Sequence, residues 1–182
     1  MSRKRTEQII ITSAALELLR AGGPRAVTVE AVAAQAGVAK TTIYRRYRDR
    51  SELLSDALSS VRDPAPPPET ASLEAALTWI IDQCHHAVEE GIGAGGVAAL
   101  LTNQDTQFND QIRAILLEHR RALTEVIRET KAAGLTRTDL DPDVALDCIV
   151  GAYLSERARA GDVARGWQDR VRNVMYPALA AI

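Results

Sequence analysis

The sequence predicts an all-α fold of about nine helices. Helix-forming residues dominate the chain, and apolar residues recur every three to four positions over most of its length. Hydrophobic residues make up 46% of the 182 residues and aromatic residues only 4%, so aliphatic side chains and alanine must fill the core. A chain of this length can bury one such core, or carry a small domain on a larger one.

A helix-turn-helix is predicted between Thr28 and Tyr47. Val29 and Val32 begin an apolar stripe with helical spacing, and the Thr28 hydroxyl can cap the start of that helix. Gly37 then turns the chain sharply, because glycine adopts backbone angles that other residues avoid. A second short helix follows from residue 39 to about 47. Two short helices around a glycine turn are typical of proteins that place the second helix in the major groove of DNA.

One predicted helix precedes this motif and another follows it. Apolar periodicity indicates a helix over about residues 6–21, which Gly-Gly-Pro at 22–24 ends. The helix after the motif, about 49–62, starts with Asp-x-x-Glu, a sequence close to a capping box. The proline-rich residues 63–70 cannot continue it, so we expect a stiff, extended connection there.

The rest of the chain predicts five more helices, separated by glycine, Asp-Pro and proline signals. They are expected at about 72–91, 97–104, 109–133, 141–160 and 162–177, with a break at the glycines between 91 and 96 and an end or kink near Pro177. The expected domains are therefore a DNA-binding head, residues 1–50, and a body, residues 71–182, joined by the helix at about 49–62.

Charge is distributed unevenly along the chain. Residues 1–60 carry 10 Lys and Arg against 6 Asp and Glu, whereas residues 61–182 carry 12 against 18. A basic head on an acidic body suits DNA binding by the head. The two cysteines, Cys84 and Cys148, lie too far apart to suggest a disulfide framework. The sequence shows no apolar leader and no long apolar run, so we expect a cytoplasmic protein without a membrane partner.

Residues 11–54 resemble the N-terminal domain of the TetR family of bacterial transcriptional regulators. The order and spacing of the matching residues agree with the family, but Ala39 stands where Ser is frequent and Arg48 where Pro is common. The matching pieces are Ile11, Ala14-Ala15, Leu18-Leu19, Thr28-Val29, Ala36-Gly37-Val38, Thr42-Ile43-Tyr44, Tyr47 in place of Phe, Arg50 in place of Lys, and Leu53-Leu54.

The resemblance implies a homodimeric repressor that binds a pseudo-palindromic double-stranded DNA operator and is released by a small apolar or amphipathic effector. It also implies that Tyr44 and Arg50 bond phosphates. We expect Tyr47 in the core of the head, and the basic residues 1–5 either as an arm that contacts DNA or as a solvated tail. The expected DNA contacts are Thr28, Lys40, Thr41, Thr42, Tyr44, Arg45, Arg46, Arg48 and Arg50.

The family also implies an effector pocket and a dimer face in the body. Pocket candidates are Trp79, Gln83, Cys84, His86, Phe108, Ile112, Leu116, His119 and Tyr153, although ordinary packing is the better explanation for each of them taken singly. The last two long helices are expected to pair with those of a second copy through Ala145, Cys148, Ile149, Ala152, Tyr153, Val171, Val174 and Met175.

Two other functional classes are alternatives for this sequence. A helix-turn-helix regulator without a small-molecule ligand fits the same residues. A helical-bundle enzyme fits poorly, because a di-iron site needs two Glu-x-x-His pairs and the chain offers only the near miss Asp82 to His85. Cys84-His85-His86 does not suit a metal either, since consecutive helical side chains point about 100° apart. We therefore expect neither catalysis nor a cofactor nor a metal.

Overall fold

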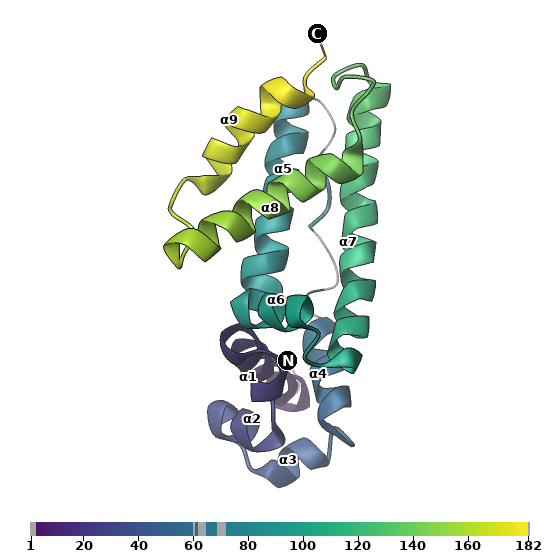
Figure 1. Cartoon of the computed structure of the whole chain (residues 1–182). Coiled ribbons are helices and arrows are strands. Elements are labelled where there is room, and N and C mark those ends of the chain that lie inside the picture. Colours follow the sequence, from purple (N-terminus) through teal and green to yellow (C-terminus); the bar gives the residue numbers. More distant parts are fainter. Residues whose placement is uncertain (1–2, 60, 62–64, 69–71, 182) are drawn as a thin grey trace. The chain divides into compact units, whose positions relative to one another are not determined.

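The computed structural model describes residues 3–59, 61, 65–68 and 72–181, and these residues form helices joined by turns (Figure 1). The predicted all-α fold class is confirmed. The elements are α1 (Arg3–Gly22), η1 (Pro24–Ala26), α2 (Val29–Ala36), α3 (Lys40–Tyr44), α4 (Arg50–Ser59), α5 (Leu73–His86), η2 (Ala87–Ile92), α6 (Gly93–Thr102), α7 (Thr106–Ala132), α8 (Pro142–Ala160) and α9 (Trp167–Leu179).

The described residues pack into two compact units. One combines residues from 1–63 with 87–116, and the other combines residues from 64–86 with 117–182. The first unit therefore holds α1 to α4, η2, α6 and the start of α7, and the second holds α5, the rest of α7, α8 and α9. Compact packing does not show which segments function independently, so the expected domain limits of 1–50 and 71–182 stay a prediction.

An aliphatic core holds the first unit together. Ile11 and Leu19 of α1, Ile43 of α3 and Leu53 of α4 are fully buried in it, with Phe108 of α7 beside α6. Burying a side chain of this size contributes about 1.5–3 kcal/mol. Leucine, isoleucine, valine and alanine fill most of this core, as the low aromatic content predicts.

The predicted break at residues 91–96 falls at Gly93, whose left-handed φ of 64° separates the π-helix η2 from α6. Helical residues lie on both sides of it, so α6 begins at Gly93 rather than at the expected residue 97. A Cβ on Gly95 would lie 2.4 Å from the amide nitrogen of Gly23 and 2.6 Å from the carbonyl oxygen of Leu19. Glycine is therefore required here because the backbones of α6 and α1 approach each other closely. The sequence alone shows glycine as a helix breaker and gives no sign of that contact.

Local sequence signals predict most helix ends correctly. The Thr28 hydroxyl accepts from the Ala31 amide at 3.1 Å, and Asp49 accepts from the Glu52 amide at 2.9 Å. Asp141 caps α8 by accepting from the Asp143 amide at 2.9 Å. At the amino end, α1 already includes Arg3, so the basic segment is part of a helix rather than a separate arm. Residues 1–2 and most of the proline-rich connection lie outside the described residues.

Aromatic side chains join three helices of the second unit. Trp167 of α9 and Tyr153 of α8 are buried and meet edge to face, with ring centroids 5.5 Å apart. His85 of α5 lies 5.6 Å from Tyr153 and 5.9 Å from Trp167. α9 begins later than expected, at Trp167, and ends at Leu179, close to the end expected near Pro177. Pro177 has no amide hydrogen, so one backbone hydrogen bond of the last turn is missing. None of the described helices is long and apolar enough to cross a membrane.

The substitution Gly95→Val should lower the free energy of unfolding by about 1–3 kcal/mol, because the new side chain meets main-chain atoms that cannot rotate away. Urea unfolding followed by far-UV circular dichroism measures this. Ala98→Val is the control, since Ala98 is exposed on the same helix and valine should cost only its lower helix propensity, less than about 1 kcal/mol. Unfolding of Gly95→Val at the wild-type urea midpoint would contradict the close contact.

Candidate nucleic-acid interface

α2 and α3 form the predicted helix-turn-helix. Gly37 ends α2 with a φ of 64°, the left-handed conformation that glycine adopts without strain. α3 spans only Lys40–Tyr44, which is shorter than the predicted 39–47. Ala39 stands at its N-cap and offers no side-chain hydrogen bond, as expected where the hydroxyl of Ser is missing. The second helix of the motif is therefore short and depends on the rest of the unit.

The residues of α3 divide into a buried side and an exposed side. Ile43 is completely buried, and Tyr47, just after the helix, is buried as well, which confirms its expected place in the core. Lys40, Thr41 and Tyr44 point outward, and Tyr44 is 55% exposed. The exposed side thus offers an ammonium group, a hydroxyl and a phenol from one short helix.

A hydrogen-bond network fixes the end of α3 against α1 and α4. The Tyr47 hydroxyl donates to Asp56 Oδ2 at 2.6 Å, and Gln8 Nε2 donates to the same oxygen at 2.9 Å. Arg46 donates to Gln8 Oε1 at 3.1 Å and to the carbonyl oxygen of Lys4 at 2.8 Å. Burial, and then the Asp56 carboxylate, raise the pKa of the Tyr47 hydroxyl, so it stays a neutral donor. Arg46 therefore faces α1, and its predicted DNA contact stays a prediction.

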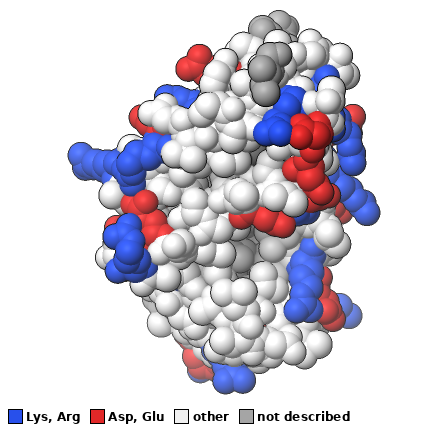
Figure 2. Space-filling model, turned by 45° about the horizontal axis from the view of Figure 1, so that its top comes forward, with Lys and Arg blue, Asp and Glu red and all other residues white. Residues whose placement is uncertain are grey.

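The other cations around α3 make only exposed ion pairs. Lys40 Nζ lies 3.0 Å from Glu30, and Arg48 Nε lies 3.1 Å from Glu52. Exposed pairs of this kind contribute about 0–1 kcal/mol, so a phosphate can replace the carboxylate at little cost. On the face shown in Figure 2, basic and acidic side chains likewise lie next to one another rather than in a field of one sign.

Arg50 lies inward, at the start of α4. Its Nε donates to the carbonyl oxygen of Val27 at 2.8 Å, and its Nη2 donates to the carbonyl oxygen of Pro24 and to Asp105 Oδ2, the latter at 3.1 Å. Asp105 also caps α7, because Oδ1 accepts from the Phe108 amide at 3.0 Å. The guanidinium thus joins η1, α4 and the start of α7. Its expected phosphate contact stays a prediction, and its present contacts are structural.

Opposing effects set the pKa of Asp105. Burial raises it, but the hydrogen bonds from the Phe108 amide and the Arg50 guanidinium together outweigh burial. The pKa of the carboxyl is therefore below its ordinary value of 3.8, and the ion pair with Arg50 is intact at neutral pH.

The expected pocket residues are divided between the two units. Phe108 and Ile112 are packed in the core of the first unit, where Leu116 is half-buried. Trp79, Gln83, Cys84, His86, His119 and Tyr153 belong to the second unit. Burial raises the pKa of the Cys84 thiol to about 12, so this cysteine is an unreactive core residue at neutral pH. An effector site at these residues stays a prediction.

The residues expected at the dimer face differ in burial. Ala145, Ile149 and Tyr153 of α8 are buried within the single chain, and their contact with a partner stays a prediction. Ala152, Val171 and Met175 are half-buried, whereas Cys148 and Val174 are exposed. Val144, which the prediction omitted, is also exposed. The outward stripe of α8 is therefore Val144, Cys148 and Gly151, with the helical spacing i, i+4, i+7.

Sequence comparison places this helix-turn-helix in a known family. Residues 11–57 match the family model for bacterial regulatory proteins of the tetR family. An uncharacterised HTH-type transcriptional regulator of Mycobacterium bovis is 33% identical over 129 residues, which are 69% of this chain and 61% of that protein. The match thus spans less than two-thirds of the length of this relative. The HTH-type regulator YdeS of Bacillus subtilis is 29% identical over 162 residues, 84% of this chain and 78% of that protein.

The helix-turn-helix segment, residues 11–57, belongs to the tetR family of bacterial regulatory proteins.

Solved structures share the fold of this chain. A transcriptional regulator from Saccharomonospora viridis, in complex with choline, superposes with a TM-score of 0.73 at 14% identity, covering 98% of this chain and 100% of that one. A TetR-family structure from Mesorhizobium loti gives a TM-score of 0.70 at 17% identity, with 100% of both chains covered. At these identities the likeness shows the fold alone. In the part of the chain that the structure describes, no three His, Cys, Asp or Glu side chains gather as metal ligands would.

Asp105→Asn should lower the free energy of unfolding by about 1 kcal/mol at neutral pH, because asparagine keeps the cap on α7 but loses the charge that pairs with Arg50. Since the folded pKa lies below the ordinary 3.8, the wild-type carboxylate contributes above that pH, and its contribution is lost as the pH falls through the folded pKa. The difference between the two proteins should therefore shrink in acid.

Urea unfolding of both proteins at neutral and acid pH measures the effect. Asp110→Asn is the matched control, because Asp110 on the same helix makes only an exposed contact of 3.8 Å with Arg113 and should change stability by less than about 0.5 kcal/mol. Equal losses from both substitutions, or a loss at position 105 that does not depend on pH, would rule out the ion pair as the cause.

Proposed function

We propose that this protein is a homodimeric transcriptional repressor of the TetR family that binds a pseudo-palindromic DNA operator with α3 in the major groove. The observation that carries this proposal is the two-sided packing of α3. Ile43 and Tyr47 are buried, while Lys40, Thr41 and Tyr44 are exposed on the opposite side. Since it acts on chromosomal DNA, the protein is proposed to work in the cytoplasm. The match to curated relatives supports the same class of function.

The exposed groups suit the two kinds of contact that DNA recognition needs. Lysine and threonine side chains bond base edges or phosphates, and a phenol bonds a phosphate oxygen. Thr28 stands at the start of α2, where free amide groups attract a phosphate. We therefore propose outward contacts by Thr28, Lys40, Thr41, Thr42, Tyr44, Arg45 and Arg48. Arg46 and Arg50 position these contacts through their bonds to α1 and α7.

Two copies of α3 are needed because one short helix reads too few base pairs. Helix-turn-helix dimers place their recognition helices about 34 Å apart, so that both reach successive major grooves on one side of the duplex. The outward residues Val144, Cys148 and Gly151 of α8 and Val174 of α9 supply an uncharged, uncovered surface for a partner copy. We propose that α8 and α9 of two chains pair through these residues.

A small molecule bound to the body is proposed to release the repressor from DNA. The relative from Saccharomonospora viridis holds choline, which supports ligand binding by a protein of this fold. A ligand shifts the equilibrium only if it binds one state more tightly, and a change from 1:99 to 99:1 needs about 5.5 kcal/mol of preference.

Binding to a duplex selected from a random-sequence pool tests the proposed function. Lys40→Ala should weaken binding about tenfold, because it removes one cation from the interface. It should also reduce the slope of the logarithm of the binding constant against the logarithm of salt concentration by about 1. Tyr44→Phe should weaken binding a few-fold through the loss of one hydrogen bond. Fluorescence anisotropy at several salt concentrations measures both effects.

Arg159→Ala is the control for this experiment, since it removes an exposed cation of α8 that lies outside the proposed interface. Its affinity and salt dependence should equal those of the wild type. If the pool yields no preferred sequence, or if Arg159→Ala weakens binding as much as Lys40→Ala, α3 is not the recognition helix.

Val174→Asp should convert the dimer to a monomer, because it places a carboxylate in the proposed apolar interface. Val174 is 71% exposed in the single chain, so the change should leave the fold intact. Leu101→Asp is the matched control, since Leu101 is equally exposed on α6 and lies outside α8 and α9. Light scattering coupled to size-exclusion chromatography reports the mass. A dimer with Val174→Asp, or a monomer with Leu101→Asp, contradicts the assignment.

A further inference from the structure

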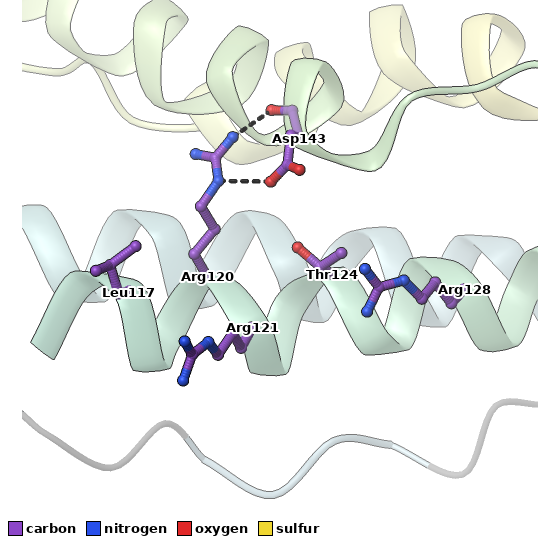
Figure 3. Close-up of a pocket in the computed structure, with 6 residues that line it drawn as sticks. All are labelled: Leu117, Arg120, Arg121, Thr124, Arg128 and Asp143. Carbon is purple, nitrogen blue, oxygen red and sulfur yellow. Dashed lines mark hydrogen bonds and ion pairs between the residues drawn. The ribbon is translucent and has the colours of Figure 1, made fainter. Parts of the chain in front are cut away.

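A cavity of about 340 Å³ lies between α7 and the start of α8, entirely within the second unit (Figure 3). Its lining is unlike that of the sequence-predicted pocket, because none of the predicted residues contributes to it and three arginines do. The lining residues are Leu117, Arg120, Arg121, Thr124, Arg128 and Asp143.

Arg120 forms a fixed wall of the cavity. Its Nε donates to Asp143 Oδ1 at 2.6 Å, its Nη1 to Asp147 Oδ1 at 2.8 Å, and its Nη2 to the carbonyl oxygen of Asp143 at 2.8 Å. The hydrogen bond to Asp147 and then the one to Asp143 keep the pKa of this guanidinium above its usual value. Arg120 therefore joins α7 to α8, and the two aspartates satisfy its charge.

Arg121 and Arg128 retain N–H groups that make no hydrogen bond with a described residue. Arg121 makes no hydrogen bond or ion pair with another described residue, and Arg128 uses a single nitrogen, Nη1, to bond Glu125 at 3.1 Å. Thr124 lies between them and is only 5% exposed. In Figure 3 the Thr124 hydroxyl points away from the axis of α7, and the guanidinium of Arg128 extends along the helix toward it.

Helical spacing brings these three side chains to one face of α7. Residues 121, 124 and 128 follow the pattern i, i+3, i+7, and Leu117 lies one turn earlier on the same face. Arg121 and Arg128 are separated by roughly 10 Å along the helix axis. Both side chains are long enough to reach one anion that lies above Thr124. Arg121 breaks no bond to a described residue when it turns toward that position.

The chemistry of this face selects an anion. Guanidinium groups bind carboxylates and phosphates through two parallel hydrogen bonds, and a threonine hydroxyl can donate a third. Leu117 is largely exposed and adds an apolar edge. The volume lies in the range of sites for small organic molecules. Asp143 and Glu125 each already have an arginine partner, so they do not cancel the charge of Arg121.

We propose that this cavity binds a small organic anion, whose carboxylate or phosphate group is held by Arg121, Arg128 and the Thr124 hydroxyl and whose apolar part lies on Leu117. The binding itself does not depend on the proposed repressor function. If the protein is a repressor, this cavity is the place where an anionic effector would enter.

Direct calorimetric titration of the full chain, without DNA, tests the site. The probes are hexanoate and hexyl phosphate, with hexan-1-ol and choline as uncharged and cationic controls. At least one anion should bind with a dissociation constant below about 10 mM, and both controls should bind at least tenfold more weakly. Whether hexanoate or hexyl phosphate binds more tightly identifies the preferred anionic group.

Substitution separates this site from general attraction to a basic surface. The double variant Arg121→Gln with Arg128→Gln should weaken anion binding at least tenfold, because each lost guanidinium removes charged hydrogen bonds. The control double variant, Arg113→Gln with Arg159→Gln, removes the same charge elsewhere and should bind like the wild type. Thermal unfolding without ligand confirms that both variants fold.

Three results would overturn the proposal: no heat from either anion up to about 10 mM, equal binding of hexan-1-ol or choline, or equal weakening by the two double variants. Because no DNA is present, failure here leaves the proposed repressor function untouched. Conversely, loss of operator binding in a DNA experiment says nothing against the anion site.

Discussion

The burial of Ile43 and Tyr47 is the constraint on which the proposed DNA-reading surface depends. A helix of five residues such as α3 is too short to persist alone in water, so tertiary packing must hold it. Ile43 is fully buried, and Tyr47 is buried with its hydroxyl bonded to Asp56 at 2.6 Å. With these two side chains fixed inward, the helix can present Lys40 and Tyr44 only outward. Packing inside the first unit therefore fixes which side of α3 faces outward.

The basic residues of the first unit serve two physical purposes. Arg46 and Arg50 bond carbonyl and carboxylate oxygens of neighbouring elements, so they order the motif from within. Lys40 and Arg48 make only exposed pairs, which a DNA phosphate can replace. A count of positive charge along the sequence cannot separate these roles, because it does not show which carbonyl groups lie near each guanidinium. The close contact of Gly95 with α1 and the contact of Arg50 with Asp105 bind α6 and α7 to the same unit.

The sequence correctly predicted the features that depend on residues close together in the chain. Thr28, Gly37 and Asp141 act within one helical turn, and the structure confirms each as a cap or turn. The misreadings concern distant contacts. α6 begins at Gly93, earlier than expected, and Gly95 packs against α1, a contact with residues some seventy positions away that the local sequence does not show. α8 is apolar on two sides, so periodicity alone could not show that Ile149 faces inward and Val144 outward. The sequence does not single out the cavity lined by Arg121, Thr124 and Arg128, because charged side chains at helical spacing are typical of a solvated helix face.

Hydrogen exchange of the chain with and without a selected operator duplex, read by mass spectrometry, tests the central claim most directly. Our account predicts that DNA slows exchange in peptides covering residues 28–31 and 39–46, which hold the exposed groups of α2 and α3. Peptides of α5, in the second unit, should exchange at the same rate with and without DNA. Slowed exchange confined to the second unit, with residues 39–46 unchanged, would contradict it.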